Sequence, residues 1–159
     1  MGVNMIEQYD ILIVDDESQF IQIILNILKE VENYNLVVAT SGEQALTLIK
    51  EHTFNLILLD IIMQPMNGYE VCEILKSDKA TKYIPIIFLT AKDDQESIEK
   101  GFRVGSVDYI IKPFYKNELL ARVDTHIKLK LYEDELKHEI EVQENLLAQQ
   151  SKMATMERF

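Results

Sequence analysis

The sequence is poor in the residues that make disulfides, tight turns and breaks in helices. Its 159 residues include one cysteine, three prolines, five glycines and no tryptophan. A single cysteine excludes a disulfide within the chain and any cysteine-based metal site. Cys72 lies in an apolar helical pattern, which indicates a buried structural thiol. A reducing compartment, the cytoplasm, is therefore the expected location.

Positive charge is also scarce. The chain has 16 lysines and arginines against 27 aspartates and glutamates, a formal net charge of -11. Direct binding to nucleic acid or to an anionic membrane needs basic patches, so neither is expected. Nothing after residue 124 forms a basic helix-turn-helix pattern, which disfavours a DNA-binding regulator. An acidic chain suits a cation-binding crevice better.

Long apolar runs are missing as well. No run approaches the roughly 18 apolar residues that a membrane span requires. The first six residues, Met1 to Ile6, contain no basic region, no apolar core and no Ser or Thr at position 6. We therefore expect neither a signal peptide nor a myristoyl anchor.

Short apolar segments alternate with helical patterns through most of the chain. Strands are expected at residues 10–15, 36–39, 54–60, 85–90 and 107–111, and helices at residues 18–32, around 45–49, 68–76 and 93–102. Such alternation forces right-handed crossovers and a parallel sheet covered on both faces. The prediction is a doubly wound α/β fold with five parallel strands in the flavodoxin-like order 2-1-3-4-5. Its ligand crevice lies between the first and third strands.

Carboxylates stand at the ends of those two strands. Asp15 and Asp16 end the first apolar run, and Asp60 ends the third. A single aspartate at a strand end is usually a turn residue or a helix cap. Three of them at one rim of a parallel sheet would repel one another unless a cation neutralised them, and hard oxygen ligands favour Mg²⁺.

Two more polar residues are expected at the same rim. Thr90 ends the fourth strand and Lys112 follows the fifth. Each alone has an ordinary explanation, the threonine as a turn residue and the lysine as half of a structural ion pair. The combination of two aspartates, one aspartate, a threonine and a lysine at successive strand ends indicates a site.

Residues 8–124 resemble the receiver domain of bacterial two-component response regulators. The resemblance rests on four motifs: ILIVDDE at 11–17, LLDIIMQPMNG at 58–68, FLTAK at 88–92 and YIIKPF at 109–114. It implies that Asp60 accepts a phosphoryl group from a sensor histidine kinase or from a small acyl phosphate. A carboxylate can attack phosphorus without a general base, provided that a metal and a cation share the charge of the transferred group.

The same resemblance assigns the metal ligands. It implies that Asp16, Asp60 and the main-chain carbonyl of Ile62 bind Mg²⁺, while Asp15 holds a metal-bound water.

For the phosphoryl oxygens, the resemblance implies contacts from Lys112 and from the Thr90 hydroxyl. It also implies a cis Lys112–Pro113 peptide bond, and a switch in which Thr90 moves inward and the ring of Tyr109 rotates. Burial of a strand aromatic would equally explain Tyr109.

The sequence departs from the family pattern beside Asp60. The proline that commonly follows Met63 directly is displaced to Pro65, although Gly68 keeps its expected distance from Asp60. Two residues after Asp60, Ile62 offers no polar group to orient water, so we expect slow intrinsic loss of the phosphate.

From Tyr115 to Phe159 the chain contains neither glycine nor proline and reads as one long helix. We expect a receiver domain at residues 1–124 and a helical, coiled-coil extension at 125–159, with a homodimer formed through the fifth helix and this extension. A single solvated helix and pairing through the receiver face are the alternatives. Two heptad stripes support the coiled coil: Leu129, Leu136, Ile140 and Leu147, then Val142, Leu146, Met153 and Met156.

Residues 146–154 resemble the helix that leads into the phosphotransfer region of sensor histidine kinases. One interpretation is therefore that the chain is the receiver part of a longer response regulator and kinase fusion. His138, like His52 and His126, is expected to be a solvated residue rather than a phosphoacceptor, and no kinase domain is expected in this chain.

Two other functions are considered. The first is a receiver-like dimerisation scaffold that is never phosphorylated, which the complete set of site residues disfavours. The second is a small Mg²⁺-dependent phosphatase, but Ile62 stands where such enzymes carry a second aspartate.

Overall fold

A computed structural model describes residues 7–157, so the expectation for Met1–Ile6 and the last two residues of the predicted helix lie outside it. Strands and helices alternate along the chain. The strands are β1 (Tyr9–Val14), β2 (Tyr34–Ala39), β3 (Leu56–Leu59), β4 (Ile86–Thr90) and β5 (Asp108–Ile111). The helices are α1 (Ser18–Leu28), α2 (Gly42–Glu51), α3 (Gly68–Ser77), α4 (Gln95–Arg103) and α5 (Lys116–Glu157).

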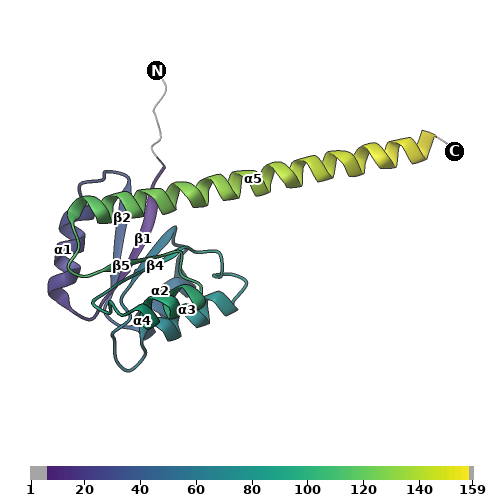
Figure 1. Cartoon of the computed structure of the whole chain (residues 1–159). Coiled ribbons are helices and arrows are strands. Elements are labelled where there is room, and N and C mark those ends of the chain that lie inside the picture. Colours follow the sequence, from purple (N-terminus) through teal and green to yellow (C-terminus); the bar gives the residue numbers. More distant parts are fainter. Residues whose placement is uncertain (1–6, 158–159) are drawn as a thin grey trace, which may run out of the picture. The chain divides into compact units, whose positions relative to one another are not determined.

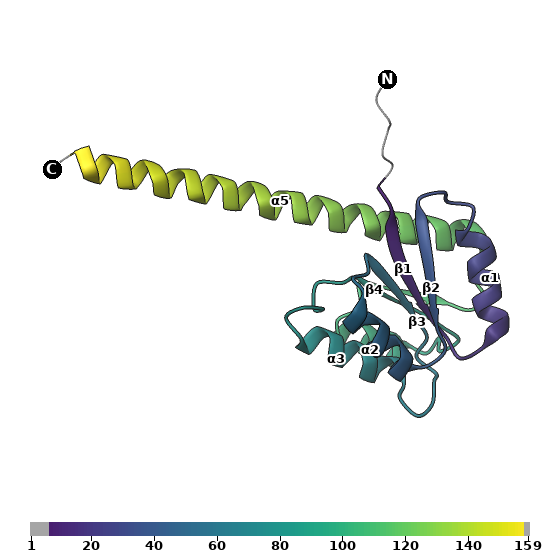
Figure 2. The same ribbon diagram turned by 180° about the vertical axis from the view of Figure 1, so that it is seen from behind.

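The five strands form one parallel sheet in the order β2-β1-β3-β4-β5, which confirms the predicted doubly wound topology. Figures 1 and 2 show α1 and the first turns of α5 on one face of the sheet and α2, α3 and α4 on the other. Both faces are covered, so β3 and β4 are buried at every residue.

Successive strand residues serve opposite faces of the sheet. Leu12, Ile57 and Phe88 belong to the cluster that packs under α2 and α3. The intervening residues Ile13 and Leu58 are equally buried but lie outside that cluster. The period of two in a strand explains this division.

Several element boundaries differ from the sequence prediction by a few residues. α1 ends at Leu28, where residues to 32 were expected, and β2 begins at Tyr34, two residues early. β3 is shorter than the predicted 54–60 at both ends. α4 begins at Gln95 because Asp94 is its N-cap and accepts a 2.9 Å hydrogen bond from the Ser97 N–H.

Pro85 precedes β4 instead of opening it. The strand begins at Ile86, while the Pro85 carbonyl accepts a 3.0 Å hydrogen bond from the Ile57 N–H. Proline lacks a ladder donor but keeps its acceptor, so the position is tolerated.

The described chain divides into two compact units, which meet between Ile127 and Lys128 within α5. In the first unit, α5 buries Leu119, Val123 and Ile127. In the second unit, every residue from Tyr132 to Glu157 is exposed. Within residues 7–157 no helix combines the length and apolarity that crossing a membrane requires.

Candidate functional site

The register of the sheet brings the predicted carboxylates together. Val14 pairs with Leu59, so the next residues, Asp15 and Asp60, emerge side by side, and the Asp60 N–H donates to the Val14 carbonyl at 2.9 Å. Asp15 and Asp60 are 1% and 3% exposed, whereas Asp16 is exposed to solvent. One carboxylate oxygen from each of the three lies within 4.8 Å of the others.

Lys112 directly follows β5, the edge strand next to β4, and its side chain reaches the same rim of the sheet. Thr90 pairs with Ile111, and the Lys112 N–H donates to the Thr90 carbonyl at 2.8 Å. The buried Lys112 ammonium lies 2.6 Å from Asp15 Oδ2 and 3.4 Å from Asp60 Oδ2. It therefore bridges the two buried carboxylates.

Phe20 completes the surroundings of this lysine. Lys112 Nζ lies 4.0 Å from the centre of the Phe20 ring, within the range of a cation–π interaction. Phe20 is one of the apolar residues in the helix that the sequence predicts at residues 18–32. Its helical spacing identified a buried face but carried no signal for contact with a lysine 92 residues later, since that contact depends on how α1 packs against the rim of the sheet.

The environment of Asp60 shifts the pKa of its carboxyl upward. Burial raises the pKa of the Asp60 carboxyl above its ordinary value of 3.8, and the charge of Asp15 raises it further. Three groups lower this pKa: the Thr90 hydroxyl, the Lys112 ammonium and the Ile62 N–H. The Ile62 N–H donates to Asp60 Oδ1 at 3.2 Å. Additional positive charge at the rim would complete the neutralisation of the carboxylates.

Thr90 is close to Asp60 but leaves one polar atom unsatisfied. Its side chain is fully buried, and Oγ1 has no partner with hydrogen-bond geometry among residues 7–157. A buried hydroxyl without a partner is costly and therefore uncommon. Next to Asp60, it is a donor available to a group attached to that carboxylate.

The loop after Asp60 is held by close contacts. A Cβ atom on Gly68 would lie 2.3 Å from the Asp60 carbonyl oxygen, so only glycine fits there. The Gly68 N–H donates to the Ile61 carbonyl at 2.9 Å. The displaced proline gives a cis Gln64–Pro65 bond, and Ile62 is 49% exposed beside the site.

The structure also bears on Pro113 and Tyr109. The Lys112–Pro113 bond is cis, as the family resemblance implied. The Tyr109 ring is buried, and its hydroxyl donates to the Lys92 carbonyl at 2.6 Å. Burial raises the pKa of the Tyr109 hydroxyl, so it is a neutral donor.

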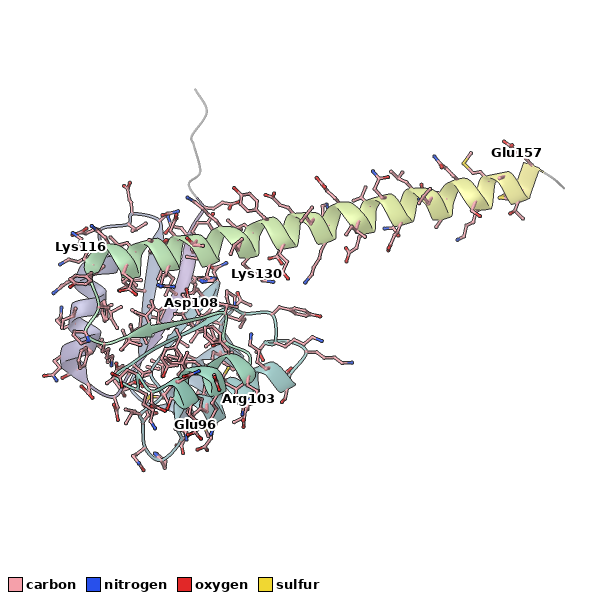
Figure 3. The ribbon with its side chains drawn as sticks, in the orientation of Figure 1. Glu96, Arg103, Asp108, Lys116, Lys130 and Glu157 are labelled. Atoms are coloured by element: carbon pink, nitrogen blue, oxygen red, sulfur yellow. The ribbon has the colours of Figure 1, made fainter. Side chains whose placement is uncertain are left out.

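The prediction that His126 is solvated is wrong. His126 Nε2 lies 2.9 Å from Asp108 Oδ2, and Arg122 Nη1 donates to both oxygens of the same carboxylate at 2.9 Å. Figure 3 labels Asp108 beside the ribbon of α5. The histidine faces β5 because it lies one turn after Arg122 on the inward side of the helix. His52 and His138 are exposed, as predicted.

The donor set fits a small hard cation. The three aspartates supply only oxygen ligands, and one of them, Asp16, is exposed to solvent. In Asp15, Oδ2 already contacts Lys112 and Oδ1 accepts from the Glu17 N–H at 2.9 Å. The corresponding contacts of Asp60 are longer, 3.4 Å to Lys112 and 3.2 Å from the Ile62 N–H. Asp16 and Asp60 are therefore better placed than Asp15 to bind a cation directly.

The profile of the response regulator receiver domain matches residues 11–124. The chain belongs to this family. Receiver domains are phosphorylated by sensor histidine kinases and act in phosphorylation signalling, and the sheet order and acidic cluster of this chain are those of a receiver.

Curated relatives and solved structures support the assignment. The chain is 39% identical over 134 residues to a Vibrio cholerae protein named "Probable cyclic di-GMP phosphodiesterase", covering 84% of this chain and 30% of that protein. It is 38% identical over 122 residues to the transcriptional regulatory protein YvrH of Bacillus subtilis, covering 77% and 50%. The chain thus spans half or less of these two relatives.

A CheY-like response regulator receiver protein of Methanospirillum hungatei has a similar structure, with a TM-score of 0.72 at 29% identity. The match covers 80% of this chain and 99% of that one. A two-component response regulator of Clostridium difficile gives a TM-score of 0.71 at 28% identity, covering 76% and 97%. The receiver fold therefore accounts for the matched part of the chain, while most of α5 after the first unit lies outside it.

Proposed function

We propose that this receiver is a phosphorylation-dependent switch whose phosphoacceptor is Asp60. The observation that carries the proposal is the buried arrangement at the strand ends. Asp60 lies beside a lysine that contacts two buried carboxylates, and beside a fully buried Thr90 hydroxyl without a hydrogen-bond partner among the described residues. A merely structural ion pair would not need that hydroxyl.

The chemistry follows from these groups. An oxygen of the ionised Asp60 carboxylate attacks phosphorus, an O–P bond forms, and the bond from phosphorus to the donor's imidazole nitrogen or acyl oxygen breaks. The leaving group keeps the bonding electron pair. Lys112 moves from sharing its charge between Asp15 and Asp60 to binding a phosphoryl oxygen, and the Thr90 hydroxyl donates to another.

The residues also fit Mg²⁺. Asp16, Asp60 and the main-chain carbonyl of Ile62 would hold the ion, and Asp15 would bind one of its waters. When bound, the ion neutralises charge on the transferred group. Asp16 is the exposed member of the set, which leaves the approach of the donor open.

The donor in the cell would be the phosphohistidine of a sensor histidine kinase. A small acyl phosphate can replace it in the test tube because the receiver supplies the catalytic groups. The single buried Cys72, whose pKa burial raises to about 11, is compatible with a reducing cytoplasm.

The output is proposed to leave through Thr90 and Tyr109. When Thr90 is drawn towards the phosphoryl group, the buried position of Tyr109 is stabilised, and the surface formed by α4, β5 and the start of α5 changes. Phosphorylation biases two existing arrangements of this surface, as in other switches.

We further propose the domain organisation of the sequence prediction, a receiver domain at 1–124 and a helical extension at 125–159. The extension would pair with that of a second copy as a coiled coil. Nine large apolar side chains on exposed positions of α5 favour this assignment: Leu129, Tyr132, Leu136, Ile140, Val142, Leu146, Leu147, Met153 and Met156. Such a helix would carry the signal onward to an output module such as a kinase.

The test of the proposed function is intact mass after incubation with acetyl phosphate and Mg²⁺. One added phosphoryl group is expected, and it should be absent with Asp60→Asn and with a chelator. Asp10→Asn, a change at the opposite end of β1, should leave uptake unchanged and serves as the matched control. No adduct under conditions that preserve acyl phosphates, and none from a set of histidine kinases, would overturn the proposal in favour of a scaffold that is not phosphorylated.

A further inference from the structure

Tyr69 makes a buried contact that the mechanism above does not use. It is the second residue of α3 and is 6% exposed. Its hydroxyl donates to the carbonyl of Ser97, in the first turn of α4, at 2.9 Å. A helical carbonyl can accept this second hydrogen bond because its oxygen has two lone pairs.

Helix α4 buries little apolar surface: only Ile98 within it and Val104 at its C-cap pack, partly buried, against the hydrophobic core. Its two buried residues, Ser97 and Gly101, are both small. The large side chain Phe102 is 48% exposed. Figure 3 marks the helix by Glu96 and Arg103 near its two ends. Because a short helix depends on the apolar area that it buries, polar contacts have an unusual weight in fixing α4.

Two of those contacts converge on Tyr69. Besides the bond to Ser97, the ammonium of Lys100 lies 4.6 Å from the centre of the Tyr69 ring. The same residues, with Lys92, Asp94 and Glu96, line a cavity of about 290 Å³. Tyr69 therefore links α3 to the first turns of α4, while Cys72 of α3 contacts the Val104 carbonyl at the other end of α4 at 3.5 Å.

An aromatic layer connects this contact to Tyr109. The Tyr69 and Phe88 rings are 5.6 Å apart, and the Phe88 and Tyr109 rings are 6.1 Å apart. Tyr109 donates to the Lys92 carbonyl, and Tyr69 donates to the Ser97 carbonyl. The hydroxyls of Tyr109 and Tyr69 therefore hydrogen-bond to the two ends of residues 92–97, the segment that follows Thr90.

Tyr69 is also joined to the phosphoacceptor by the main chain. The preceding residue, Gly68, lies so close to the Asp60 carbonyl that a Cβ atom would approach it to 2.3 Å. A shift of the main chain at Asp60 must therefore move the first turn of α3. The ring of Tyr69 would carry that movement to α4.

We propose that Tyr69 is the positioning residue that couples the phosphorylation site to α4. Its hydrogen bond to Ser97 selects the arrangement of α4 in which Tyr109 is buried, and this arrangement accompanies phosphorylation. The inference rests on the proposed function and deepens it, since it names how the same site would regulate the output surface.

Tyr69→Phe is the test because it removes only the hydroxyl and keeps the ring against Phe88 and Lys100. Tyr115→Phe, at an 83% exposed position, is the matched control. The full chain is incubated with acetyl phosphate and Mg²⁺, uptake is measured by intact mass, and amide hydrogen exchange is followed with and without the phosphoryl group.

Wild type and Tyr115→Phe should show α4 exchange that slows on phosphorylation. In Tyr69→Phe, uptake should be retained, while exchange at residues 94–100 becomes about fivefold faster, the effect of one hydrogen bond. Its response to phosphorylation should be largely lost. Exchange in β1 and β3 should not change, which separates loss of coupling from general loosening of the fold.

If Tyr69→Phe takes up the phosphoryl group and its α4 responds as in wild type, the coupling role is overturned while the proposed function stands. Uniformly faster exchange through the first unit would also overturn it, because Tyr69 would then be only structural. If wild type takes up no phosphoryl group, the proposed function fails and the coupling fails with it. Mass and exchange together distinguish these outcomes.

Discussion

At the scale of single residues, the charge balance at the Asp15–Asp60 site depends on Lys112. Its ammonium lies within 3.4 Å of two buried carboxylates, and among the described residues it is the one cation paired with them. Burial of two carboxylates is tolerable only while this charge is present. The residue that serves the proposed chemistry therefore also stabilises the unphosphorylated fold.

Lys112→Met should accordingly lower the free energy of unfolding at pH 7 by about 3–5 kcal/mol when Mg²⁺ is chelated. The pKa of Asp60 is raised already, so protonation at lower pH neutralises the carboxyl, and the loss should shrink as the pH falls towards that raised pKa. Urea unfolding of wild type and Lys112→Met at several pH values measures this loss of unfolding free energy. Lys116→Met, which breaks the exposed pair with Glu30, should cost less than about 1 kcal/mol. Equal losses for the two variants would contradict the prediction.

Ile62 gives a second prediction at this scale. The side chain is 49% exposed beside Asp60 and offers no group to orient an attacking water. Phosphorylated wild type should therefore retain its phosphate for minutes or longer, and Ile62→Asn should lose it about tenfold faster or more, because it can position water. Loss of the adduct over time, measured by intact mass, is the readout. Ile74→Asn, at a similarly exposed position on α3, is the control, and a wild-type half-life of seconds would refute the idea.

At the scale of elements, the meeting of the site residues was predictable because parallel strands end at one rim. The sequence places Asp15, Asp60 and Lys112 directly after apolar runs. The registers of β1, β3, β4 and β5 then bring these three side chains to the same rim. The exact ends of the helices and strands were harder to predict from the sequence. α4 begins where Asp94 caps it, and residue 93 was an equally good candidate by composition.

The Asp108 cluster shows why other contacts could not be foreseen. Asp108 is at the start of β5 and its partners Arg122 and His126 are on α5, so the contact depends on how a helix lies across a strand. No period in the sequence encodes that crossing. The clearest available signal was the spacing of four between Arg122 and His126, which places both on one face.

Asp108→Asn should destabilise the first unit because it weakens this link between β5 and α5. Burial alone would raise the pKa of Asp108, but hydrogen bonds from His126, the Tyr109 N–H and Arg122 together hold it below 3.8. A lowered pKa means that the stabilisation is present above 3.8 and is lost as the pH falls through the lower, folded value. The variant should lose about 1–3 kcal/mol of unfolding free energy at pH 7 and at pH 5, and less below 3.8. Asp134→Asn, in an exposed pair with Lys130, should change little; a loss that persists unchanged in acid would rule the carboxylate out as its source.

At the scale of the whole molecule, the chain combines a unit with its own core and a unit without one. Residues up to Ile127 include a sheet buried on both faces, whereas residues 132–157 form a helix that is exposed throughout. An isolated helix of this length gains little from propensity alone and is normally stabilised by packing of an apolar face. The sequence identified the long helix and its stripes, but a stripe does not specify its partner.

Truncation after Ile127 should therefore leave a folded receiver that accepts the phosphoryl group but no longer self-associates. The cut belongs there because Val123 and Ile127 are buried in the first unit, so an earlier end would damage its core. Sedimentation equilibrium should show a dimer for the full chain and a monomer for residues 1–127.

The double variant Leu136→Asn with Leu147→Asn should weaken the dimer in the full chain, because knobs-into-holes packing uses the apolar seam. The control, Glu141→Asn with Ala148→Asn, lies off both heptad stripes and should not weaken it. A dimer that survives both the truncation and the leucine changes would locate pairing on the receiver face and leave α5 as a solvated linker.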